Sequence, residues 1–262
     1  MDIGLDGPED YAALQKTLAM IQVIGQLGDS LPEDPALLGE PGSDLADLMS
    51  ALPEPPVDLR LSISAGLATA RAALSQISGF IVDGVPTTPS VLHTLVRSAL
   101  LGVGRVVYVL GPPSAEARQE NARMVLRQEG NSLMRAYSAF EQFKQLNLVP
   151  PADIMAAQRE RNNVVQCGAG AIREEKTLVA MATVIGEMLT ANGYESPEGW
   201  PLAELMTWIF HVYSGVAHGF GWPRLVPGTD SMPGLFVPEF YMVTCVAQIA
   251  FDVTLRRTIV AM

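Results

Sequence analysis

Apolar residues recur at helical spacing along almost the whole chain, and this pattern constrains the fold more than any other feature of the sequence. Between residues 63 and 81, six of them follow at steps of four and three without a break: Ile63, Leu67, Ala70, Leu74, Ile77 and Ile81. Such steps place all six on one face of an α-helix. No segment alternates apolar and polar residues over the length of a strand. We therefore expect an all-α fold, a multi-helix bundle of about seven to eight helices.

Glycine, proline and capping residues divide this pattern into segments. The helix through residues 63–81 is expected to stop at Asp83-Gly84. Further helices are expected over about 8–27, 88–110, 114–147, 150–174, 178–191, 202–218 and 238–259. A short helical piece is expected after Asp34-Pro35, because aspartate followed by proline is typical of a helix start. Residues 222–238, rich in glycine and proline, are expected to form a loop.

The acidic residues are concentrated at the start of the chain. Residues 1–56 hold eleven acids and one base, Lys16, whereas residues 57–262 hold 17 acids and 16 bases. We therefore divide the chain into an acidic N-terminal helical segment with a Pro-rich linker, 1–56, and a helical bundle body, 57–262. Two interpretations of the segment remain open. It is either a solvated arm, as such charge runs usually are, or an arm that docks on a mildly basic surface between Arg97 and Arg161.

Composition excludes several classes of protein. With 48% hydrophobic residues the chain has enough apolar surface for a core, which excludes wholesale disorder. A net charge of −11 argues against a strongly basic nucleic-acid binder, so nucleic acid is an unlikely partner. Two cysteines, Cys167 and Cys245, are too few for a disulfide framework.

Neither a targeting segment nor a membrane span is expected. The acidic start, MDIGLDGPEDY, lacks the positive charge and apolar run of a secretory signal. The three most apolar stretches, residues 92–111, 202–221 and 236–255, each contain ionisable side chains. We interpret them as buried helices of a large soluble domain, expect no membrane partner and place the protein in the cytoplasm.

A polar stripe runs through the expected helix over 202–218. Its members lie three or four residues apart, on one helical face: Glu204, Thr207, His211, Ser214 and His218. Buried polar groups need partners, so the stripe either forms hydrogen bonds inside the core or lines a cleft. Because histidine transfers protons near neutral pH, His211, Ser214 and His218 are the candidate catalytic residues.

Metal and cofactor chemistry find no support in the sequence. His211 and His218 are seven residues apart, about 10 Å along a helix, which is too far for one zinc ion. The HExxH and CxxC motifs and the glycine-rich phosphate loops are absent. We therefore expect neither a metal nor a cofactor.

The helix expected over 88–110 carries a second polar line. His93 and Arg97 are four residues apart, and an arginine in such an apolar helix is rarely unpaired. The acids proposed to neutralise Arg97 are Glu129, Glu141 and Glu204. The line is either a structural ion pair or an anion site, and the candidate ligand-binding residues are His93, Arg97 and Tyr213.

Two segments resemble known proteins. SVLHTLVRSALLGVGRVVYVLGP (90–112) and YSGVAHG (213–219) resemble a group of uncharacterised all-helical bacterial proteins of actinobacterial type. This chain has Leu101 where that group often has an acidic residue. The second segment is also similar to the end of HEPN-type helical domains, some of which cleave RNA. Their motif places an arginine shortly before the histidine, whereas the nearest upstream arginine here is Arg173.

Three functions follow from these observations. The first is a helical interaction or scaffold protein that self-associates, with His211 and His218 buried and hydrogen-bonded. The second is a small-ligand-binding or catalytic domain, in which a cleft gathers histidine, serine and arginine side chains. The third is a HEPN-like RNA-directed protein whose acidic segment masks a basic groove. We expect the first, with the protein forming a homo-oligomer and specifically a homodimer.

Overall fold

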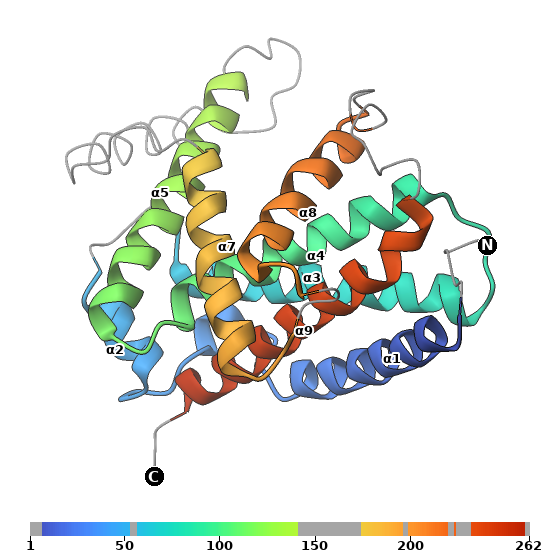
Figure 1. Cartoon of the computed structure of the whole chain (residues 1–262). Coiled ribbons are helices and arrows are strands. Elements are labelled where there is room, and N and C mark those ends of the chain that lie inside the picture. The colour runs from blue at the N-terminus through green and yellow to red at the C-terminus, as the bar shows by residue number, and fades with distance from the viewer. Residues whose placement is uncertain are drawn as a thin grey trace.

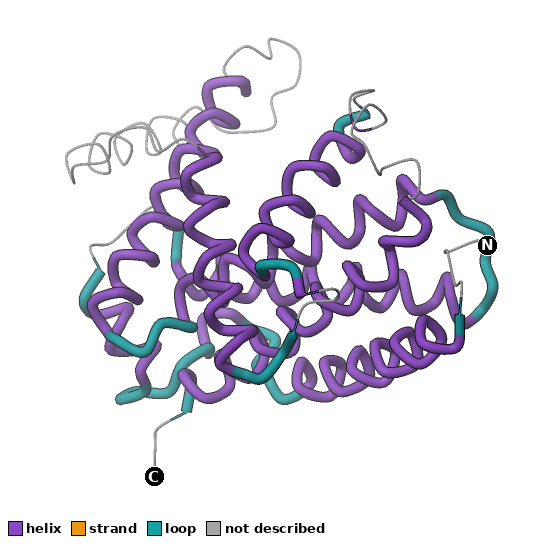
Figure 2. Tube along the Cα trace, viewed as in Figure 1, coloured by secondary structure: helices purple, strands orange, loops and turns teal. Residues whose placement is uncertain are grey.

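The computed structural model describes residues 7–52, 57–140, 174–195, 199–219, 223 and 232–259. Figures 1 and 2 show the described helices packed against one another. The described elements are α1 (Pro8–Asp29), a 3-10 helix η1 (Pro35–Leu37), α2 (Asp44–Ser50), α3 (Leu59–Val82), α4 (Pro89–Leu110), α5 (Ala115–Phe140), α7 (Glu174–Ala191), α8 (Leu202–Ala217) and α9 (Met232–Thr258). These ranges contain eight α-helices and no strand, which confirms the predicted all-α bundle.

Helix α4 lies at the centre of the bundle. It contacts α3, α5, α7, α8 and α9, and thirteen of its residues are buried. Its closest neighbour is α3, whose backbone meets that of α4 at two glycines. A Cβ atom added to Gly66 would lie 2.6 Å from the carbonyl oxygen of Gly102. Only residues without side chains therefore permit this crossing.

The predicted boundaries agree with the structure for most helices and differ most at α9. This helix begins at Met232, so residues 232–237, expected in a loop, are helical. Phe236 and Val237 are both buried in the core, and their burial favours continuing the helix through Pro238, which removes one backbone hydrogen-bond donor. The helix predicted over 150–174 falls almost wholly on 141–173, outside the described residues. The linker 53–56 lies outside them as well.

The described part of the acidic segment packs on the rest of the bundle. Its buried residues, which belong to the same hydrophobic cluster as the body, are Leu14, Ile21, Ile24, Leu38, Leu45 and Leu48. Asp44 forms ion pairs with Arg257 and, at 3.8 Å, with the buried Arg118. Asp29 pairs with Arg71 at 2.5 Å. These contacts favour the docked interpretation over the solvated one, although Arg118 alone of the three bases belongs to the surface between Arg97 and Arg161.

Two described helices are long and apolar enough to cross a membrane, Pro89–Leu110 and Phe236–Thr258. In the second helix, 78% of the most apolar 18-residue stretch is buried inside the protein. Helices of the same length and composition form the cores of large soluble proteins, so this finding is weak evidence for a membrane. The expected absence of a membrane partner stays a prediction.

Candidate functional site

Two of the three candidate ligand-binding residues lie together in the core. The rings of His93 on α4 and Tyr213 on α8 stack with their centroids 4.4 Å apart. The ring centroid of Phe236 on α9 lies 6.2 Å from that of His93. Both His93 and Tyr213 are at most 2% exposed. Three helices therefore meet at an aromatic junction that contains one imidazole and one phenol.

Arg97 lies one turn after His93 on α4 and is half-buried. Of the acids predicted to neutralise it, Glu129 instead pairs with Arg105, at 2.7 Å between Nη1 and Oε1. Glu204 is exposed in the first turn of α8, and Glu141 lies outside the described residues. The ion pair of Glu129 is therefore with the arginine two turns further along α4.

The candidate catalytic residues lie on the outer face of α8. His211 and His218 are exposed, and Ser214 is half-buried. The opposite face packs into the core through its large apolar side chains, which include Leu205, Met206, Ile209 and Phe210. The expected burial of the two histidines is therefore wrong: the polar stripe is the solvent-facing side of an amphipathic helix. His211 and His218 thus face solvent, whereas His93 and Tyr213 are buried in the core.

The core also contains an acid that was not among the predicted site residues. Glu239 of α9 is 2% exposed, and its Oε1 accepts a hydrogen bond from Trp208 Nε1 at 3.1 Å. Burial raises the pKa of Glu239 to about 8, so its carboxyl group is protonated at neutral pH. Its sequence signal was a single carboxylate within an apolar run, which we used only as an argument against a membrane span.

The junction of α4, α8 and α9 is uncharged at neutral pH. Burial lowers the pKa of His93 to about 4, so this imidazole is neutral while Glu239 is protonated. Among the described residues the buried hydroxyl of Tyr213 has no hydrogen-bond partner. The described part of the chain contains no group of three metal-ligating side chains. We therefore interpret the junction as a structural polar core.

A second feature lies on the outer face of α3. The predicted inner seam, which starts at Ile63, faces the core, with its first five residues buried. On the opposite face an outer seam repeats the same steps of four and three: Leu61, Ala65, Ala68, Ala72, Ser75, Gly79 and Val82. Six of these seven residues are exposed, and Gly79 is half-buried. None carries a charge. This outer seam was not among the features predicted from the sequence.

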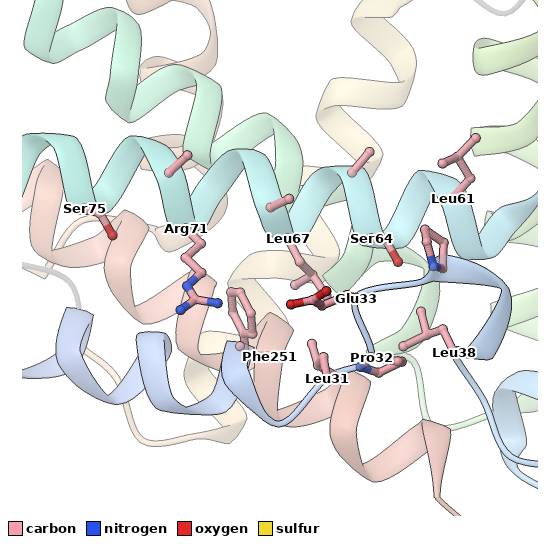
Figure 3. A pocket seen from close by; sticks show the side chains of 15 residues that line it. Leu31, Pro32, Glu33, Leu38, Leu61, Ser64, Leu67, Arg71, Ser75 and Phe251 are labelled. Carbon is pink, nitrogen blue, oxygen red and sulfur yellow. The ribbon is translucent and has the colours of Figure 1, made fainter.

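The outer seam from Leu61 to Ser75 forms one side of a groove of about 610 Å³, which we call the α3 groove (Figure 3). The opposite side consists of the segment after α1, which contributes Leu31, Pro32, Pro35 and Leu38. Phe251 of α9 also lines the groove. Arg60 anchors this segment, since its Nη1 donates a hydrogen bond to the carbonyl oxygen of Ala36 at 3.0 Å. The acidic N-terminal segment therefore builds half of the groove.

Two ionisable side chains line the α3 groove, Arg71 and Glu33. Arg71 bonds Asp29, and both partners are substantially exposed. Glu33 forms no ion pair with any described residue. Helix α3 itself contains two arginines and no acid, whereas the whole chain has a net charge of −11. The groove is thus a mainly apolar surface with one carboxylate left to bind a cation.

Comparison with known proteins adds no family to this description. The chain matches no protein-family model, and searches of the curated proteins and of the solved structures return no significant match.

Proposed function

We propose that this protein is a helical interaction protein that self-associates through the α3 groove. The observation that carries the proposal is the outer seam: seven uncharged residues at heptad spacing along the length of a helix, six of them exposed. Two helices pack along such a seam in a coiled coil, because steps of four and three keep it facing the partner. The catalytic alternative lacks comparable support, since His211 and His218 are exposed on the outer side of α8 and do not line the α3 groove.

The composition of the seam favours close contact between helices. Alanine, serine and glycine in its central turns allow two backbones to approach, which increases van der Waals contact along the pair. Leu61 and Val82, 51% and 67% exposed, stand at its two ends and would lose apolar surface to water on binding. Burying this face costs little desolvation of charge, because the seam has none.

The charge of the chain favours the same surface. Two copies that each carry −11 repel each other over most of their surfaces. The repulsion is weakest where a surface lacks acids, and α3 has none between Leu59 and Val82. A second copy of the chain is therefore the occupant that we propose for the α3 groove.

Sedimentation equilibrium of the full chain tests this proposal. We expect a mass of twice 28.1 kDa at micromolar concentrations. The variant Ala68→Arg places a long charged side chain in the middle of the seam and should raise the dissociation constant at least about tenfold, or 1.4 kcal/mol. Ala12→Arg, at an exposed alanine of α1 outside the groove, is the matched control and should leave the dimer intact. A monomeric wild-type chain would contradict the proposal.

A further inference from the structure

The arrangement of the two copies can be inferred from the α3 groove, on the basis of the proposed self-association. Closed dimers are two-fold symmetric, so each copy uses the same surface and residues near the axis meet their own counterparts. The outer seam has its large residues at the ends and its small residues in the centre. The closest approach therefore falls near Ala68 and Ala72.

Helix polarity favours an antiparallel pair. Two α3 helices side by side in parallel place like ends of their dipoles together, whereas an antiparallel pair places opposite ends together. The positions of the arginines also favour an antiparallel pair. A parallel pair brings Arg60 near Arg60 of the partner subunit, while an antiparallel pair separates these two side chains by most of the helix.

The ionisable residues of the groove complement each other across such a pair. Arg71 lies next to the centre of the seam, and Glu33 lines the same groove without an ion pair among the described residues. Figure 3 shows both side chains on the side of α3 that faces the N-terminal segment. A two-fold axis near the seam centre carries Arg71 of the partner subunit to that side. The guanidinium has five donors, enough for Asp29 and a second carboxylate.

We infer that two copies pair through antiparallel α3 helices, with the axis near Ala68 and Ala72, and that Glu33 of each copy binds Arg71 of the partner subunit. The partner class is a second copy of this chain. The acidic N-terminal segment thereby forms part of the interface between the two copies, and its residue Glu33 binds the partner subunit.

Cysteine cross-linking tests the arrangement. In a Cys167→Ser background, Ala72→Cys should form a disulfide-linked dimer under mild oxidation. Val82→Cys should not, because its two copies would lie about 30 Å apart at 1.5 Å per residue. A mixture of Leu61→Cys and Val82→Cys chains should cross-link to each other. If Val82→Cys links to itself instead, the pair is parallel and the inference is overturned, although the proposed self-association stands. If sedimentation shows only monomers, the proposed function itself fails.

Charge exchange tests the contact between Glu33 and Arg71. Glu33→Arg and Arg71→Glu should each raise the dissociation constant about tenfold, whereas the double variant should return to within about threefold of wild type. The exposed pair between Arg71 and Asp29 contributes little, so its loss should not mask the rescue. Glu187→Arg, at an exposed acid of α7, controls for the change in net charge. If the double variant has a dissociation constant as high as those of the two single variants, this contact is excluded, although the proposed dimer still stands.

Discussion

Helix α4 takes part in two very different contacts. Towards α3 it forms an apolar crossing, where the backbones at Gly66 and Gly102 almost touch. Towards α8 and α9 it forms the junction that buries His93, Tyr213 and Glu239. The crossing depends on volume and contains no group that titrates. The junction depends on protonation, since its carboxyl and imidazole are both neutral only within a limited pH range. One helix thus combines a contact sensitive to size with a contact sensitive to pH.

The largest effect is expected from ionising the junction. The pKa of Glu239 is raised to about 8 from an ordinary value of 4.5, so its stabilising contribution is present below pH 4.5 and is lost as the pH rises through 8. This difference corresponds to on the order of 5 kcal/mol. Urea unfolding between pH 5 and pH 9 should show this loss for the wild-type protein and only a small remainder for Glu239→Gln, whose amide can still accept the Trp208 bond. Glu187→Gln, an exposed acid of α7, should retain the full pH dependence.

The crossing should respond to volume instead. Gly66→Ala places a Cβ 2.6 Å from the carbonyl oxygen of Gly102, so the two backbones must separate. We expect a loss of at least about 3 kcal/mol in the free energy of unfolding, the same at pH 5 and pH 8, because the new Cβ meets backbone atoms rather than a flexible side chain. Gly79→Ala on the same helix is the matched control. Its new Cβ would meet nothing closer than 4.0 Å, so higher helix propensity should stabilise the protein by up to about 1 kcal/mol. Equal effects of the two substitutions would show that the crossing is not tight.

The sequence predicted the helices because their pattern depends on local spacing. The inner seam of α3 and the polar stripe of α8 were both recognised from steps of three and four. Spacing defines a face but does not determine whether a polar face points inward. For α8 the large apolar residues, Ile209 and Phe210 among them, occupy the core, so His211 and His218 face solvent. The face with the larger apolar surface is the one that is buried, because its burial removes more apolar area from water. Comparing the two faces of α8 in this way would have predicted that His211 and His218 are exposed.

The junction could not be predicted in the same way. The stack of His93 on Tyr213 joins residues 120 positions apart, and the bond from Trp208 to Glu239 joins two different helices. Such contacts depend on how α4, α8 and α9 cross, which no local pattern specifies. A single acid within an apolar run, such as Glu239, nevertheless signals a buried carboxyl. Both seams of α3 could also be predicted from the sequence. The groove could not, because its second side is the segment after α1, whose position depends on tertiary packing.

A smaller pH effect is expected on the acidic side of the junction. The pKa of His93 is lowered to about 4 from 6.5, so its contribution is present above pH 6.5 and is lost as the pH falls through 4. This corresponds to about 3 kcal/mol. His93→Phe keeps an aromatic ring against Tyr213 without a titrating group and should remove most of this loss in unfolding experiments at pH 4 to 7. His211→Phe changes an exposed histidine and should leave the acid dependence unchanged.

The smallest effect concerns the hydroxyl of Tyr213, which is buried without a partner among the described residues. Removing an unsatisfied buried polar group relieves its desolvation cost, so Tyr213→Phe should stabilise the protein by about 1 kcal/mol at pH 6. The ring keeps its stack on His93, and the packing volume barely changes. Tyr11→Phe, at an exposed tyrosine of α1, should have no measurable effect. If Tyr213→Phe instead destabilises the protein, the hydroxyl is hydrogen-bonded in solution, and the junction leaves no buried hydroxyl without a partner at this position.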